Sequence, residues 1–122
     1  MSLKKILVVD HNKSARELLS ESFSGLEFAV HTVSNGREAV LQMEQTPPDL
    51  ILLDMMMPTM NGHQFISRVR KKSNIPIIMI TTNHQEHDVV QGFELGADDC
   101  VTKPLRMREL LMRVRAVIRR SA

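Results

Sequence analysis

Four side chains with complementary chemistry follow hydrophobic runs that are far apart in the sequence. Asp10 follows "ILVV", and Asp54 ends "DLILLD". Thr81 follows "PIIMI", and Lys103 follows "DCVT". A carboxylate can attack a phosphoryl group and form an acyl phosphate, while a second carboxylate shares a divalent cation with the first. An ammonium group stabilises charge on the phosphoryl oxygens, and a hydroxyl can donate a hydrogen bond to the product. Together these residue types are suited to phosphoryl transfer.

Each of these residues also has a simpler interpretation. Strands often end in Asp because Asp favours turns. Thr81 alone fits a strand residue, and Lys103 alone fits a surface lysine. The joint placement favours chemistry, because ligands of open α/β sheets bind outside the carboxyl ends of the strands.

Apolar runs and helical patterns alternate along the 122 residues. Helical spacing of apolar residues after each run predicts five strand–helix pairs. Strict alternation requires parallel strands joined by crossovers, and therefore an α/β fold with helices on both faces of the sheet. The strands are predicted at Lys5–Asp10, Phe28–Val33, Asp49–Asp54, Ile75–Thr82 and Asp98–Lys103.

Local signals mark where helices begin and end. Ser14 and Glu17 have the spacing of a capping box for the first helix. Pro47 and Pro48 end the second helix, because proline cannot continue its hydrogen-bond ladder. The third helix is predicted at Asn61–Lys72, and Gly96 is placed as the C-terminal cap of the fourth.

Composition limits the class of protein. Hydrophobic residues make up 43% and charged residues 25% of the chain, as in ordinary globular domains. No export signal or membrane-spanning run is evident, so we expect a cytoplasmic protein. The segment from Val101 onward carries seven basic residues and one acidic residue, a net charge of +6. A basic helix can face nucleic acid or an acidic partner, but a solvated face whose arginines favour the helix C-terminus is the simpler interpretation.

Four segments carry a pattern that extends over nearly the whole chain: "ILVVD" (Ile6–Asp10), "DLILLDMMMPTMNG" (Asp49–Gly62), "PIIMITT" (Pro76–Thr82) and "GADDCVTKPL" (Gly96–Leu105). Together they resemble the receiver domain of two-component response regulators, over essentially the whole chain. The resemblance implies one receiver domain at residues 1–122 with a flavodoxin-like (βα)5 three-layer sandwich. Its five-stranded parallel sheet would have the order 2-1-3-4-5.

The resemblance also implies a role for each candidate residue. Asp54 would be the phosphoacceptor, and Asp10, Asp54 and the backbone carbonyl of Met56 would hold Mg²⁺. Lys103 would contact the phosphoryl group, and Thr81 would be the switch hydroxyl. The peptide bond between Lys103 and the following proline would be cis.

The partners implied by the resemblance are a sensor histidine kinase or phosphotransfer protein, and an output domain or partner protein. The output would meet the face formed by the fourth helix, fifth strand and fifth helix, with homodimerisation on phosphorylation. The domain would be a switch that catalyses its own phosphorylation and dephosphorylation. No membrane contact and no direct nucleic-acid contact are expected of it.

His11 departs from the family pattern, in which a second acid follows the first. Neutral imidazole is a poor ligand for Mg²⁺ and suits Zn²⁺, Cu or Ni better. We therefore expect weakened Mg²⁺ affinity, slower phosphorylation and altered metal or pH preference. Two alternatives stay open: His11 is only a loop residue, or its presence has ended metal chemistry and left a phosphorylation-independent protein-binding pseudo-receiver.

Cys100 is a second departure, since many receivers carry an aromatic residue there. We expect inert packing rather than a redox role for this cysteine. The remaining histidines show no metal-ligand spacing and are interpreted as surface residues: His31, His63, His84 and His87.

Two other classes of function fit poorly. A flavin-binding protein would need a glycine- or hydroxyl-rich phosphate loop after the first strand, and "DHNKSARE" has one serine and no glycine. No Ser-His-Asp or Cys-His set supports a hydrolase. The last helix resembles receivers that continue into a DNA-binding domain, so the chain is either a free-standing receiver or part of a longer transcription factor.

Overall fold

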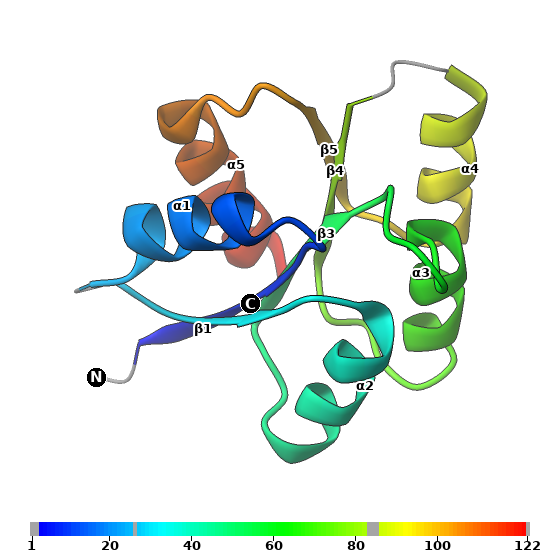
Figure 1. The fold of residues 1–122 in the computed structure, drawn as a ribbon, viewed down its shortest axis with the longest axis horizontal. Coiled ribbons are helices and arrows are strands. Elements are labelled where there is room, and N and C mark those ends of the chain that lie inside the picture. The colour runs from blue at the N-terminus through cyan, green and yellow to red at the C-terminus, as the bar shows by residue number, and fades with distance from the viewer. Residues whose placement is uncertain (1–2, 26, 83–85, 122) are drawn as a thin grey trace.

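The computed structural model describes residues 3–25, 27–82 and 86–121. Five parallel strands form one sheet in the order β2-β1-β3-β4-β5, and a helix follows each strand (Figure 1). The predicted fold class and strand order are therefore confirmed. The strands are β1 (Lys4–Val9), β2 (Phe28–Val33), β3 (Leu50–Asp54), β4 (Ile77–Thr81) and β5 (Asp99–Thr102). The helices are α1 (Lys13–Phe23), α2 (Gly36–Gln45), α3 (Gly62–Arg70), α4 (Glu86–Leu95) and α5 (Met107–Ser121).

The helices cover both faces of the sheet, with α1 and α5 on one side and α2, α3 and α4 on the other (Figure 1). Alternate residues of the central strands face the two layers, as pleating requires. Ile51 and Leu53 of β3 pack in the core under α2, α3 and α4. Leu50 and Leu52 pack in the core under α1 and α5. Both faces of β3 are therefore buried, which explains its uninterrupted run of aliphatic residues.

The first helix begins differently from the prediction. Asn12 is the N-cap, and its side-chain oxygen accepts a hydrogen bond from the N–H of Ala15 at 2.9 Å. The capping box assigned to Ser14 and Glu17 is wrong, because the helix starts at Lys13, directly after a short turn, and both residues lie within it. The chain therefore turns from β1 into α1 within a few residues of Asp10.

The other helix boundaries follow their local signals more closely. Asn61 caps α3 and forms a full capping box with Gln64. The second helix ends at Gln45, just before Pro47 and Pro48. Gly96 follows α4 with a φ of +118°, a region in which glycine has no steric penalty.

The basic α5 buries Leu110, Val114 and Val117 and exposes its charged side. Arg113 forms ion pairs with Asp99 and Glu109, both at 3.1 Å. These intramolecular pairs agree with the interpretation of α5 as a solvated face.

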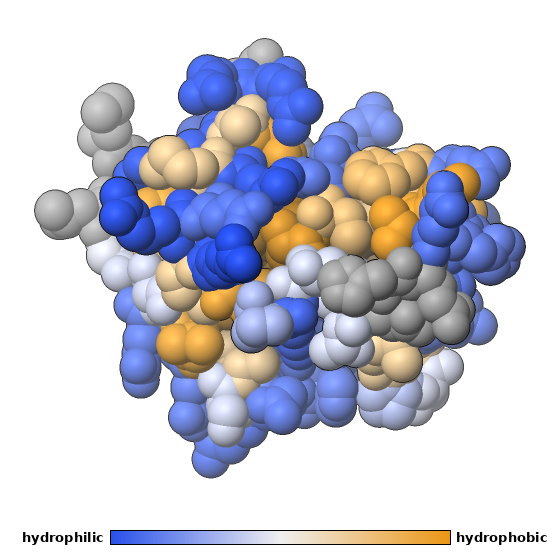
Figure 2. Space-filling model, turned by 90° about the horizontal axis from the view of Figure 1, so that it is seen from above, coloured by the Kyte–Doolittle hydropathy of each residue, from blue (hydrophilic) through white to orange (hydrophobic). Residues whose placement is uncertain are grey.

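Apolar side chains are also present on the surface. Figure 2 shows them as several orange areas among hydrophilic groups. The large exposed ones come from different elements: Leu3, Leu18, Leu41, Met56, Val90, Phe93 and Met112. In the described part of the chain, no helix has the length and apolar character needed to cross a membrane.

Candidate functional site

Two neighbouring strands place the two candidate carboxylates side by side. Val9 of β1 pairs with Leu53 of β3, so the next residue of each strand lies at the same level of the sheet. Those residues are Asp10 and Asp54, of which only 1% and 2% of the surface is exposed. The hydrophobic strands thus act as rigid supports that hold two buried acids at the carboxyl edge of the sheet.

Asp10 lies in an environment that disfavours its charge. Burial raises the pKa of its carboxyl, and the hydrogen bond from Asn12 lowers this pKa. The negative charge of Asp54 raises the pKa further. Oδ1 accepts that bond from the Asn12 N–H at 2.9 Å. Oδ2 is buried and has no hydrogen-bond partner among the described residues. A buried carboxylate oxygen without a partner favours the approach of a cation.

Asp54 is held by two contacts on its two oxygens. Oδ1 accepts a hydrogen bond from the N–H of Met56 at 3.0 Å. Oδ2 lies 2.6 Å from Nδ1 of His11. The same nitrogen lies 3.9 Å from Oδ1 of Asp10. His11 is therefore in direct contact with the candidate acceptor, and is not a loop residue that faces away from it.

Lys103 and Thr81 reach the same edge from the strands beyond β3. Thr81 is the last residue of β4 and is buried, with 7% of its surface exposed. Its carbonyl accepts a hydrogen bond from the N–H of Lys103 at 2.9 Å, directly after β5. The ammonium of Lys103 lies 3.6 Å from Oδ2 of Asp10. The peptide bond between Lys103 and Pro104 is cis, as expected.

Asp10, His11 and Asp54 form a group that can hold a metal ion. Each offers one ligand atom, and these atoms all lie within 4.8 Å of one another. Two carboxylates with a nearby ammonium are suited to neutralising and positioning a phosphoryl group. Met56 is linked to the group through its N–H, while its side chain is exposed.

Thr81 also lines a cavity of about 320 Å³ next to this group. Sulfur-containing side chains make up much of its wall, including Met57 and Cys100. Burial, and then the charge of Asp99, raises the pKa of the Cys100 thiol, which agrees with an inert role.

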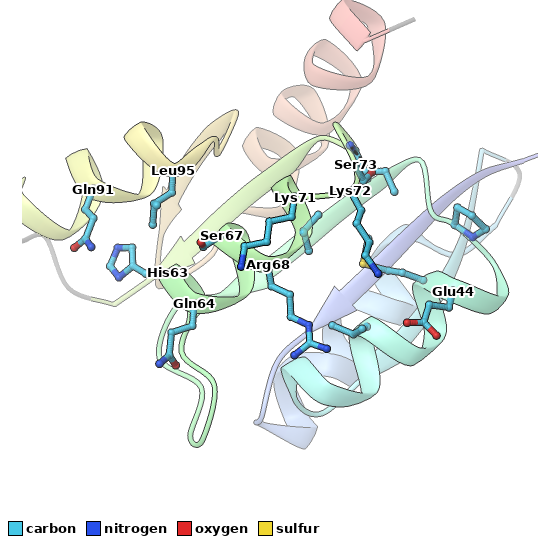
Figure 3. A pocket seen from close by; sticks show the side chains of 15 residues that line it. Glu44, His63, Gln64, Ser67, Arg68, Lys71, Lys72, Ser73, Gln91 and Leu95 are labelled. Carbon is cyan, nitrogen blue, oxygen red and sulfur yellow. Dashed lines mark hydrogen bonds between the residues drawn. The ribbon is translucent and has the colours of Figure 1, made fainter.

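A second cavity, of about 890 Å³, lies between α2, α3 and α4 and is lined by none of the four candidate residues (Figure 3). Its wall contains the aliphatic side chain of Leu95 and the basic side chains of Arg68, Lys71 and Lys72. The wall mixes apolar, polar and charged side chains, but the buried acids lie at the carboxyl edge of the sheet and not in this cavity.

The other histidines take different positions. His31 and His87 are exposed, as expected. His63 is half-buried and donates from Nε2 to the carbonyl oxygen of Asp88 at 2.8 Å, so its interpretation as a surface residue is wrong. It joins α3 to α4, a contact between elements that spacing in the sequence does not reveal. His84 lies outside the described residues.

Sequence reasoning missed two further contacts at the site. The contact between His11 and Asp54 crosses 43 positions of sequence, and the strand register alone does not fix the direction of a loop side chain. Nη1 of Arg16 donates to the carbonyl oxygen of Asp10 at 2.8 Å. The position of Arg16 one turn into the helix after β1 is the signal that could have indicated this contact.

The fold and the group of buried acids define a flavodoxin-like α/β domain with its site at the carboxyl edge of the sheet. The family model for the response regulator receiver domain matches residues 6–115. The chain therefore belongs to the response regulator receiver domain family. In agreement with this, the chain is 43% identical over 120 residues to the transcriptional regulatory protein CpxR homolog of Haemophilus influenzae.

A second relative is the alkaline phosphatase synthesis transcriptional regulatory protein PhoP of Bacillus subtilis, 44% identical over 119 residues. These matches cover 98% and 97% of this chain but only 52% and 50% of the relatives. The chain thus spans about half the length of the curated relatives that it matches.

Solved structures show the same fold. The chemotaxis protein CheY4 of Vibrio cholerae is 31% identical, with a TM-score of 0.90 over 95% of this chain and 99% of that one. The receiver domain of the Francisella response regulator 1452 is 28% identical, with a TM-score of 0.90 over 98% of this chain and 99% of that one.

Proposed function

We propose that the chain is a phosphorylation-controlled switch in which Asp54 accepts a phosphoryl group from a sensor histidine kinase or phosphotransfer protein. The convergence of buried Asp54, buried Asp10 and the ammonium of Lys103 at one sheet edge is the observation that carries this proposal. Membership in the receiver family makes a phosphohistidine the expected donor.

The proposed reaction uses side chains at this edge of the sheet together with the phosphodonor and a divalent cation. An oxygen of Asp54 forms a bond to phosphorus while the phosphorus–nitrogen bond of the phosphohistidine breaks, and the electron pair stays on the leaving imidazole. Lys103 stabilises the charge on the phosphoryl oxygens, and the Thr81 hydroxyl donates a hydrogen bond to the acyl phosphate. In the hydrolysis that resets the switch, a water oxygen forms a bond to phosphorus while the bond between phosphorus and the Asp54 oxygen breaks, so that inorganic phosphate leaves and the carboxylate is restored. The domain is thus proposed to catalyse its own phosphorylation and dephosphorylation.

The residues present fit a divalent cation, because Oδ2 of Asp10, which accepts no hydrogen bond from the described residues, and the carboxylate of Asp54 provide hard oxygen donors. Asp10, Asp54 and the backbone carbonyl of Met56 would hold it. The family cofactor is Mg²⁺, which when bound offsets the repulsion between the acids and neutralises phosphoryl charge. His11 stands where a further oxygen ligand is usual, so we propose a weakened affinity for Mg²⁺.

The output is proposed to lie at the face formed by α4, β5 and α5. Val90 and Phe93 of α4 and Met112 of α5 are large apolar side chains exposed on the elements of this face. Phosphorylation would shift a pre-existing equilibrium and present this surface to an output domain, a partner protein or a second copy. Because the relatives are about twice as long and are named as transcriptional regulators, a DNA-binding output domain in the cytoplasm is the proposed context.

The test is incubation with acetyl phosphate and a divalent cation, followed by intact-mass measurement. We expect a gain of one phosphoryl group in the wild type and none in Asp54→Asn. Lys103→Met should reduce the rate of adduct formation while preserving the circular dichroism spectrum. Absence of an adduct in folded wild-type protein with every divalent cation tried would contradict the proposal.

The contact between His11 and Asp54 favours one alternative, a pseudo-receiver that binds its partner without phosphorylation. In this case His11 keeps the acceptor oxygen covered, and the surface around α4, β5 and α5 works by protein contact alone. The same mass experiment separates the two functions, because a pseudo-receiver gives no adduct and binds its partner equally well with Asp54→Asn.

A further inference from the structure

The candidate metal group contains a nitrogen donor, which changes the class of cation that it suits. Its three members are Asp10, His11 and Asp54, two carboxylates and one imidazole. Mg²⁺ prefers oxygen ligands in near-ideal octahedral geometry and retains several waters. Imidazole suits borderline transition-metal ions, and the affinity of mixed nitrogen and oxygen sites for them rises along the series from Mn²⁺ to Cu²⁺.

The burial of Asp10 favours a cation beside this group. Oδ2 of Asp10 is buried without a hydrogen-bond partner among the described residues, in a side chain that is 1% exposed. Lys103 neutralises this oxygen only in part, because its ammonium lies 3.6 Å away, beyond ordinary hydrogen-bond distance. A buried carboxylate oxygen without a hydrogen bond is an independent sign of a cation site.

The position of the His11 ring agrees with a shared ion. Nδ1 lies 2.6 Å from Oδ2 of Asp54 and 3.9 Å from Oδ1 of Asp10. Two atoms bound to one ion at about 2.1 Å lie roughly 3 Å apart, between these two separations. A small movement of the half-exposed ring, with the Nδ1 proton passed to Nε2 or to solvent, would therefore exchange its contact with Asp54 for a shared metal ion.

We infer that Asp10, His11 and Asp54 form a two-carboxylate, one-histidine site that selects a borderline transition-metal ion such as Zn²⁺ or Co²⁺ over Mg²⁺. His11 is a ligand of the ion in this site and sets its selectivity. The inference deepens the proposed function, because it concerns the cation of the same site, but metal binding does not require phosphorylation to be detected.

The test is calorimetric titration of the intact chain with Zn²⁺, Co²⁺ and Mg²⁺ in separate experiments without a phosphodonor. His11→Asp should strengthen Mg²⁺ binding and weaken Zn²⁺ binding, so that the ratio of the two affinities changes by at least about tenfold. His11→Ala should weaken Zn²⁺ and Co²⁺ binding alone. His87→Ala removes an exposed histidine of α4 and should leave all three affinities unchanged.

A spectroscopic readout reports directly on the ligands of the bound ion, whatever the effect of a variant on stability. Co²⁺ bound to the wild type should show visible absorption bands that shift in His11→Asp and persist in His87→Ala. Equal affinity ratios in wild type and His11→Asp, or a Co²⁺ spectrum unchanged by the His11 variants, would overturn the inference. Labelling of Asp54 by acetyl phosphate is measured separately. A protein that binds the metal but gains no phosphoryl group would contradict the phosphoacceptor proposal alone.

Discussion

Nδ1 of His11 lies 2.6 Å from Oδ2 of Asp54, in a site where the other oxygen of Asp54 already accepts the N–H of Met56. Both oxygens of the candidate acceptor therefore have a partner, and each keeps a second lone pair that a metal ion can use. His11 is the partner that can move, because its side chain is 46% exposed and the Met56 contact comes from the backbone. We therefore expect His11 to influence the proposed phosphorylation of Asp54.

The buried pair of acids predicts a stabilising substitution. Asp10→Asn keeps an acceptor for the Asn12 N–H and removes a buried charge next to Asp54, an effect that outweighs the loss of the 3.6 Å ion pair with Lys103. In metal-free protein near pH 7, we expect it to raise the free energy of unfolding by about 1–3 kcal/mol. Urea unfolding in the presence of a chelator measures this change, with Asp88→Asn, outside the acid pair, as the matched control.

The pH dependence of this effect has a definite sign. Burial raises the pKa of Asp10 above its ordinary value of 3.8, so the folded state holds this proton more tightly than the unfolded state. The stability that protonated Asp10 contributes is present below the pKa of the unfolded state and is lost as pH rises through the pKa of the folded state. The advantage of Asp10→Asn should therefore shrink as pH falls toward the ordinary value, and a constant advantage would contradict the assignment.

The largely buried guanidinium of Arg70 predicts a large loss of stability even for a conservative substitution. Arg70 donates five hydrogen bonds, and its side chain is 17% exposed. The acceptors are the carbonyl oxygens of Ser73, Ile75 and Gly96 and the carboxylate of Asp98. Lysine cannot reproduce this fork, so Arg70→Lys should lower the free energy of unfolding by about 2–3 kcal/mol.

The control for Arg70→Lys lies on the same helix. Arg68 is exposed, and Arg68→Lys should change the free energy of unfolding by no more than about 0.5 kcal/mol. Equal losses for the two variants, measured by urea unfolding, would show that the contacts of Arg70 contribute nothing specific.

Two glycines should differ in how much stability they lose on substitution by alanine, because one faces backbone atoms and the other faces a side chain. A Cβ on Gly62 would lie 2.8 Å from the Cα of Met55, next to Asp54, and would also meet the Met55 sulfur. A Cβ on Gly92 would overlap the sulfur and methyl end of the Met79 side chain and would make an ordinary contact with Nε2 of His63. Gly62→Ala should therefore cost more than about 2 kcal/mol, and Gly92→Ala less, because a methionine side chain can move. Thermal unfolding of both variants decides the order, and a larger loss at Gly92 would contradict the argument.

The central strands and their ends could be predicted from the sequence because burial on both faces leaves a direct signature. The run Leu50–Leu53 and the single acid after it correspond to a strand covered by two helical layers and a carboxylate at the sheet edge. Parallel register then places Asp10 beside Asp54, since consecutive residues of paired strands advance together. These features depend on pattern and topology, which the sequence expresses locally.

The errors and omissions concern directions of individual side chains. Asn12 rather than Ser14 caps α1, because several residues near the turn have capping side chains and only the path of the chain selects one. His63 contacts a carbonyl of α4, and His11 contacts Asp54, across long sequence separations. Tertiary packing decides such contacts, and residue type with spacing does not contain them.

The loop after β3 predicts a stabilising substitution close to the site. Thr59 has a φ of +69°, an unfavourable value for a β-branched residue, and the N–H of Met60 donates to the carbonyl oxygen of Pro58 across it at 2.8 Å. Glycine has no steric penalty at this φ but loses more entropy on folding. We expect a net gain of about 1 kcal/mol in the free energy of unfolding for Thr59→Gly. Thr59→Ala keeps a Cβ in the same conformation and should gain much less stability. Equal gains for the two variants in urea unfolding would show that backbone strain at residue 59 is not the cause.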